Sequence, residues 1–148
     1  MTAEFIVAVH ALALLDRRAA SCSSEALAKN VCTNPARVRK VLSKLERAGL
    51  VAAKNGSRGG YAPTKPAGEV TLLQILDAMG APCVCLRWRS GALDPDCVVA
   101  SGMSGVMDGV LAELEDGCRA VLARTTLADI DRRLFPDGAA EKEAPCNT

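Results

Sequence analysis

Three of the seven cysteines lie in a segment that lacks regular apolar patterning, at Cys83, Cys85 and Cys97. Thiolates on a loop are soft ligands that suit an iron–sulfur cluster. Arg87 and Arg89 lie nearby and would favour the reactive thiolate form needed by a redox switch. The side chains of a Cys-x-Cys pair point to opposite sides of an extended segment, which disfavours shared ligation. A cluster, a thiol switch and simple space-filling are therefore three interpretations of this group.

The other cysteines give no obvious ligand set. Cys22 precedes a predicted helix, Cys32 lies in a predicted turn and Cys118 lies on a long helix. We predict that these three are packing residues. The odd number of cysteines argues against a disulfide framework, and the apolar run at residues 5–15 is too short to cross a membrane. We therefore expect a cytoplasmic protein.

A second kind of chemistry is electrostatic. Between Lys29 and Lys65 there are nine basic residues and one acidic residue, Glu46. The chain up to Pro66 has eleven Lys or Arg against four Asp or Glu, a net charge of +7. Residues 67–148 have seven against thirteen, a net charge of −6. This division predicts that the first half binds a polyanion and that the second half has another task.

Two predicted helices joined by a tight turn carry many of these basic residues. Ser23 and the residues after it are typical of a helix start, and this helix extends to about Val31. Asn34 and Pro35 begin the next helix, which Gly49 ends.

The second of these helices has one apolar face and one basic face. Four positions fall at the spacing of a buried face, namely Val38, Val41, Leu42 and Leu45. The opposite line contains Ala36, Lys40, Ser43 and Arg47, with Arg37, Arg39 and Lys44 on the flanks. The pattern is that of a helix-turn-helix whose second helix enters a major groove, although an ordinary solvated helix would also fit it.

A predicted β-hairpin follows directly. Residues 50–54 and 59–62 have strand character, and Asn55-Gly56 between them is a strong hairpin signal. Such a hairpin after a recognition helix forms the wing of a winged helix. Its tip offers Lys54, Ser57 and Arg58 to a phosphate or a minor groove.

These elements predict a set of DNA contacts. We expect base readout from Thr33, Asn34, Ala36, Arg37, Arg39 and Lys40. We expect phosphate or minor-groove contacts mainly from Lys44, Arg47, Lys54 and Arg58.

The acidic half contains a long predicted helix, at residues 98–123. Apolar residues recur along it at alternating steps of three and four, which is typical of a seam against a partner helix. They are Val99, Met103, Val106, Val110, Leu114, Cys118 and Val121. We therefore predict a homodimer, although packing within one subunit would leave a similar pattern.

The expected fold is mainly α with a small β-hairpin. We divide the chain into a winged helix-turn-helix domain at 1–66, a linker helix with the cysteine loop at 67–97, a helical dimerisation segment at 98–134 and a disordered tail at 135–148.

The chain resembles the Rrf2 family of bacterial winged-helix regulators. The motifs Ala48-Gly49-Leu50-Val51 and Arg58-Gly59-Gly60-Tyr61 carry the resemblance, together with residues 24–28, 33–42, 71–72, 94–97 and 125–130. It implies a homodimeric regulator with residues 34–40 at the major groove and residues 54–58 at the minor groove. Members that bind a cluster place three iron ligands in the loop that corresponds to the one containing Cys83, Cys85 and Cys97 here. The ligand cysteines of those members are more evenly spaced than these three. In the alignment Val7 also stands where other members supply a carboxylate.

The favoured function is a sequence-specific DNA-binding regulator, most simply a repressor on a pseudo-palindromic operator. Its input would be redox state, an iron–sulfur cluster, or a small-molecule or protein effector. The alternative is a cysteine-based redox or metal-handling protein without DNA binding. No catalytic Ser, His and Asp set accompanies the cysteines, so we predict that the chain is not an enzyme.

Overall fold

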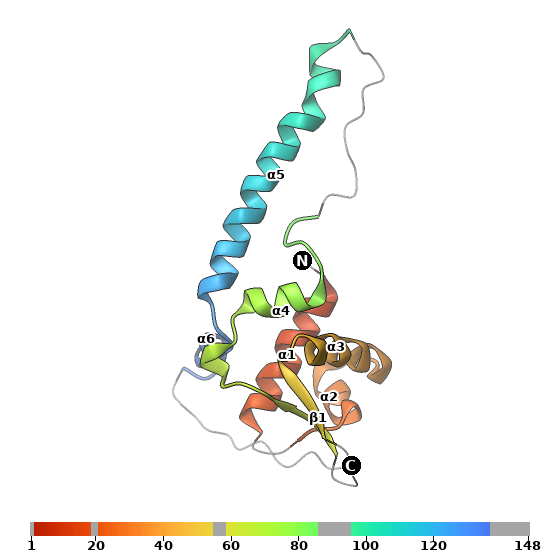
Figure 1. Cartoon of the computed structure of the whole chain (residues 1–148), viewed down its shortest axis with the longest axis vertical. Coiled ribbons are helices and arrows are strands. Elements are labelled where there is room, and N and C mark those ends of the chain that lie inside the picture. Colours follow the sequence, from red (N-terminus) through yellow and green to blue (C-terminus); the bar gives the residue numbers. More distant parts are fainter. Residues whose placement is uncertain (1, 19–20, 55–58, 86–95, 137–148) are drawn as a thin grey trace.

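The computed structural model describes residues 2–18, 21–54, 59–85 and 96–136. They form a helical body from which one long helix projects (Figure 1). The elements in chain order are α1 (Ala3–Arg17), α2 (Ser24–Val31), α3 (Pro35–Arg47), β1 (Val51–Lys54), β2 (Gly60–Pro63), the short 3₁₀ helix η1 (Ala67–Glu69), α4 (Leu72–Met79), α5 (Val98–Arg124) and α6 (Leu127–Leu134). The prediction of a mainly α fold with a small hairpin is confirmed.

The hydrophobic core lies where α1 packs against α2, α3, α4 and α6. Large side chains from these helices are fully buried, among them Leu12, Leu27, Leu42, Ile75 and Leu127. The core therefore crosses the boundaries that we predicted after residues 66 and 97. In structural terms α4 and α6 belong to the same body as the helix-turn-helix.

Local capping fixes the helix-turn-helix. The Ser23 hydroxyl accepts a hydrogen bond from the Ala26 N–H at 3.2 Å and begins α2. The Asn34 side chain accepts one from the Ala36 N–H at 2.7 Å and begins α3, with Pro35 in the first turn. Between them, Cys32 adopts a left-handed conformation with φ of 54° and turns the chain. The residues predicted to begin these helices thus do so.

The hairpin is fastened to the body through Cys22. β1 and β2 pair antiparallel, with Lys54 opposite Gly60 and Ala53 opposite Tyr61. Tyr61 and Cys22 then exchange two backbone hydrogen bonds, at 2.8 and 3.0 Å. A Cβ on Gly60 would lie 2.6 Å from the Cys22 carbonyl oxygen, so only glycine fits at this crossing.

The base of α5 is anchored to the body at both sides. The Leu72 N–H donates to the Thr125 carbonyl at 2.9 Å, and the Leu127 N–H donates to the Val70 carbonyl at 2.8 Å. Thr126 caps α6 in a reciprocal capping box with Asp129. The end of α5 nearest α6 is therefore held in place.

The C-terminal end of α6 also contacts α1. Arg17 forms an ion pair with Asp131 at 2.8 Å, and its guanidinium lies 3.5 Å from the centre of the Phe135 ring. Phe135, which we placed at the start of a disordered tail, thus packs on the body.

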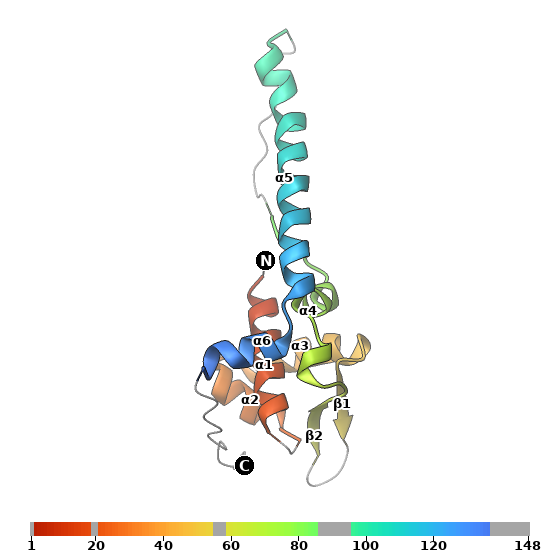
Figure 2. The same cartoon turned by 90° about the vertical axis from the view of Figure 1, so that its left-hand side faces the viewer.

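The rest of α5 projects away from the body (Figure 2). Leu122 is the only residue of this helix that the described subunit buries. Gly102, Gly105 and Gly109 lie in its outer half, with no other group within 4 Å of the position that a Cβ would take. No helix among the described residues is both long enough and apolar enough to cross a membrane.

Candidate nucleic-acid interface

The outer face of α3 is exposed and basic. The four apolar positions predicted to face inward, Val38, Val41, Leu42 and Leu45, are fully buried. Packing on this face against α1, α2 and α4 orients the helix, so the opposite line is left to solvent. Ala36, Arg37, Arg39, Lys40 and Arg47 are all exposed.

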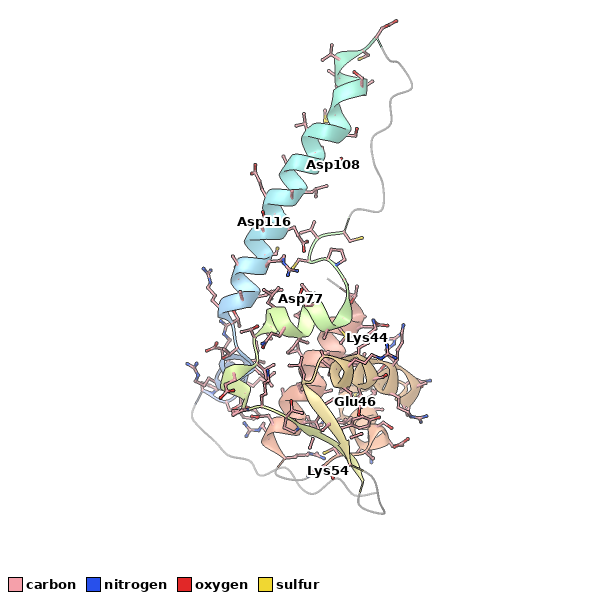
Figure 3. The ribbon with its side chains drawn as sticks, viewed as in Figure 1. Lys44, Glu46, Lys54, Asp77, Asp108 and Asp116 are labelled. Atoms are coloured by element: carbon pink, nitrogen blue, oxygen red, sulfur yellow. The ribbon has the colours of Figure 1, made fainter. Side chains whose placement is uncertain are left out.

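Charges are segregated between the body and the long helix. Figure 3 shows Lys44 and Lys54 on the body, from α3 and β1, whereas Asp108 and Asp116 lie on the projecting α5. This arrangement places Asp108 and Asp116 away from the basic residues of α3 and the hairpin, while Glu4 and Glu25 pair with some of those basic residues. A polyanion would therefore be attracted to the helix-turn-helix side of the subunit.

Arg39 is held by α2. Its guanidinium forms an ion pair with Glu25 at 3.1 Å and donates from Nε to the Ser24 hydroxyl at 3.3 Å. Hydrogen bonds from the Glu25 backbone and the Ser24 hydroxyl, with a smaller contribution from Arg39, lower the pKa of Glu25 below its ordinary value. This pairing connects the two helices of the motif and fixes the direction in which Arg39 extends.

Two lysines of α3 share one carboxylate from α1. Glu4 accepts a hydrogen bond from Lys40 Nζ at 2.7 Å on one oxygen and from Lys44 Nζ at 2.7 Å on the other. Lys44 also donates to the Met79 carbonyl at 3.0 Å, at the end of α4. Lys44 is therefore half-buried and engaged within the subunit, whereas Lys40 remains largely exposed. Sequence patterns did not reveal Glu4, because the pairing joins residues about forty positions apart.

Three predicted contact residues keep their charge unpaired. Arg37, Arg47 and Lys54 take part in no ion pair within the described part of the chain. They are exposed, at the first turn of α3, the last turn of α3 and the end of β1. Ser57 and Arg58, predicted at the hairpin tip, lie outside the described residues. Of the turn residues, Thr33 is half-buried and Asn34 uses its side-chain oxygen for the cap.

Glu4 predicts a specific acid sensitivity. Hydrogen bonds from Lys40 and Lys44 lower its pKa from 4.5 to about 2. Since the folded-state pKa is depressed, the ion pairs stabilise the fold above about pH 4.5, and this stabilisation is lost as the pH falls towards 2. We expect Glu4→Gln to reduce the loss of unfolding free energy between about pH 7 and about pH 3, measured by urea denaturation. An unchanged acid sensitivity would contradict this role.

The three loop cysteines do not form one site in the described subunit. Glu115 of α5 accepts hydrogen bonds from the Cys83 N–H at 3.1 Å and the Val84 N–H at 2.9 Å. Cys97 immediately precedes α5 and stands eighteen residues before Glu115. At 1.5 Å per residue this separates them by about 27 Å along the axis.

The chemistry of Cys83 agrees with this separation. Burial and the neighbouring Glu115 carboxylate raise the pKa of its thiol, which disfavours the thiolate that a metal needs. No three His, Cys, Asp or Glu side chains gather as a metal-binding group in the ranges the structure describes. Cys83, Cys85 and Cys97 as placed therefore do not fit a shared iron–sulfur cluster within the subunit. Arg87 and Arg89 lie outside the described residues.

The packing predictions for the single cysteines are correct in part. Cys22 is buried in the core, and Cys118 is half-buried against it. Cys32 is exposed, so its assignment as a packing residue was wrong. The left-handed turn at Cys32 places its side chain outside the α2–α3 contact.

The seam predicted on α5 is exposed in the subunit. Val106 is 66% exposed and Leu114 is 52% exposed, although both are large apolar residues. Val99, Met103, Val110 and Val121 are also exposed, and Cys118 alone among the predicted seam residues is half-buried. Within the part of the subunit that the structure describes, this stripe is therefore left mostly uncovered.

Comparison with known proteins gives a consistent family. The family model Rrf2, described as an iron-dependent transcriptional regulator, matches residues 1–133. YwgB of Bacillus subtilis, named as an HTH-type transcriptional regulator, is 28% identical over 133 residues, covering 86% of this chain and 81% of YwgB.

Solved structures agree with the sequence comparison. A protein from Lactobacillus plantarum named as a transcriptional regulator superposes with a TM-score of 0.79 at 27% identity, covering 93% of each chain. IscR of T. potens superposes with a TM-score of 0.70 at 17% identity, covering 92% of this chain and 88% of IscR, and shares the fold. The matching family and these relatives are described as transcriptional regulators and not as enzymes. The prediction that the chain is not an enzyme is therefore confirmed. The chain belongs to the Rrf2 family of winged-helix transcription regulators.

Proposed function

We propose that the protein is a homodimeric repressor that binds a pseudo-palindromic operator through α3 and the wing. The observation that carries the proposal is the oriented basic face of α3, whose apolar side is fully buried and whose outer side is exposed. A helix of this kind fits a major groove, where base edges can be distinguished. Lys54 at the end of β1 would follow the backbone into the adjoining minor groove.

The exposed stripe on α5 supports the dimer. Apolar side chains of the size of Val106 and Leu114 rarely form a continuous exposed stripe on a monomer. Pairing of two α5 helices would cover this stripe and relate the two α3 helices by a two-fold axis. Recognition helices in such dimers lie about 34 Å apart, one turn of DNA. A dimer held on a promoter in this way acts most simply by excluding RNA polymerase.

Salt-dependent DNA binding tests the proposal. Operator fragments would be selected from the genome on the purified protein, and the affinity measured by fluorescence anisotropy over a range of salt. Arg47 and Lys54 from two subunits offer four cations for phosphates, without an ion pair in the described residues. At about 0.9 released counterions per phosphate, we expect a log–log slope of about −4. A redox or metal-handling protein without a DNA function would select no operator fragment and would show no such salt dependence.

Arg37 provides a residue-level test. We expect Arg37→Ala to weaken binding to the operator by roughly tenfold and to random DNA much less, if Arg37 reads a base edge. Its stability should not change, because the side chain is exposed and has no ion pair within the described chain. Arg124→Ala removes the same charge from an exposed residue at the C-terminal end of α5, outside the helix-turn-helix and the hairpin, and is the matched control. Equal losses on operator and random DNA would assign Arg37 to the phosphate backbone.

A further inference from the structure

Glu4 is the acidic group most closely involved with the basic face of α3. Its two oxygens lie 2.7 Å from Lys40 Nζ and 2.7 Å from Lys44 Nζ, so a single carboxylate engages both lysines. The side chain of Glu4 is 24% exposed, and that of Lys40 is 64% exposed. The ion pair therefore lies at the edge of the surface that would meet DNA.

A carboxylate at this place opposes simple attraction to DNA. A phosphate that approaches Lys40 must displace Glu4 or share the lysine with it, and the like charges of phosphate and Glu4 repel each other. Exchanging one anionic partner for another gains little binding free energy. Lys44 is held more firmly, because the Met79 carbonyl is its second acceptor at 3.0 Å. The two lysines thus add less to non-specific binding than their number suggests.

The same contact orients Lys40 for base readout. A lysine ammonium has three donors, and Glu4 occupies one of them. Two donors remain on an exposed side chain whose flexibility the carboxylate has already reduced. Acceptors on a base edge can use these two donors while the ion pair with Glu4 persists. A matching base therefore adds hydrogen bonds to Lys40, whereas a phosphate competes with the existing hydrogen bond between Lys40 and Glu4.

We propose that Glu4 is a specificity-determining residue, which holds Lys40 and Lys44 against non-specific phosphate contact and leaves Lys40 oriented towards base-edge acceptors. This inference rests on the DNA-binding function proposed above. It makes α1 a contributor to recognition, although the helix-turn-helix consists of α2 and α3.

The experiment compares Glu4→Gln with the wild-type chain on the selected operator and on random DNA of the same length, across a range of salt. We expect the variant to bind random DNA roughly tenfold more tightly and the operator no more than about threefold more tightly. The salt slope on random DNA should steepen by about two, because Lys40 of each of the two subunits gains a phosphate. The ratio of operator to random affinity should fall accordingly.

Glu46→Gln is the matched control, because it removes one negative charge from exposed α3 at a residue without an ion pair in the described chain. It should not reproduce the loss of selectivity. If Glu46→Gln had an equal effect, or if Glu4→Gln raised the affinity for both DNAs equally, the inference would be overturned. The change in affinity would then follow from the change in net charge alone.

Lys40→Gln gives a second route that leaves α1 untouched. Because Glu4 already neutralises Lys40 on random DNA, the variant should weaken operator binding and change random binding little. Equal weakening on both DNAs would overturn the inference. The outcomes separate the two proposals: wild-type protein without salt-dependent DNA binding would refute the proposed function, whereas normal binding with unchanged selectivity in Glu4→Gln would refute the role of Glu4 alone.

Discussion

Replacing Val110 by aspartate is expected to convert the protein to monomers and to weaken operator binding by at least about a hundredfold. Val110 lies in the middle of the exposed stripe of α5, and a dimer formed through this stripe would bury one copy from each subunit. Two unpaired carboxylates buried side by side would oppose association strongly. Each monomer would then bind one half-site on its own. The affinity gained when two linked subunits bind both half-sites together, about 10² to 10⁴, would be lost.

Ala112→Asp is the matched control for this prediction. Ala112 is exposed, and it lies two residues after Val110, about 200° around the helix. The control adds the same charge to the same helix and should leave the dimer intact. Sedimentation analysis would measure the assembly state, and anisotropy the DNA affinity. A Val110→Asp protein that remains dimeric would show that the stripe on α5 is not the dimer interface.

Replacing Gly60 by alanine is expected to lower the free energy of unfolding by about 3 kcal/mol. The added Cβ would lie 2.6 Å from the Cys22 carbonyl oxygen and 2.7 Å from the Cys22 carbonyl carbon. Both are backbone atoms in the bridge that fastens the hairpin to the body, so they cannot move without breaking hydrogen bonds. The positive φ of 152° at Gly60 adds strain for any other residue. Urea denaturation would measure the change.

Gly68→Ala provides the comparison. No group lies within 4 Å of the position of its Cβ, and its φ is not in the left-handed region. That substitution should be neutral or slightly stabilising, because alanine reduces the conformational freedom of the unfolded chain. Similar losses in the two variants would mean that the crossing at Cys22 is not as tight as described. Weaker DNA binding by Gly60→Ala is also expected, since Lys54 pairs opposite Gly60.

Local rules predict most of the elements that position the interface. Asn34 with Pro35 begins α3 and Ser23 begins α2, because these side chains satisfy backbone donors within three residues of themselves. The buried side of α3 follows from helical periodicity alone. Such features depend on neighbours in the sequence, so the sequence is sufficient to predict them.

Contacts between distant residues could not be predicted in this way. Periodicity places Lys44 on the flank of α3, but Glu4 and the Met79 carbonyl decide where its ammonium lies. The exposure of Cys32 was missed for another reason, because it follows from the left-handed turn at that residue, which the apolar character of cysteine does not indicate. The predicted domain boundaries at 66 and 97 did not anticipate a core shared by α4 and α6, because apolar periodicity shows that a face is buried without showing its partner.

The outer half of α5 has few means of remaining helical alone. Each of Gly102, Gly105 and Gly109 disfavours a helix by about 1 kcal/mol relative to alanine, and the subunit's own core does not reach this region. A second chain would supply the missing burial, so this half would become ordered as two chains meet. Protein concentration then enters the folding equilibrium itself. Newly made chains would remain exposed to cellular proteases at low abundance, and the amount of regulator in the cell would depend on how readily it finds its own copy.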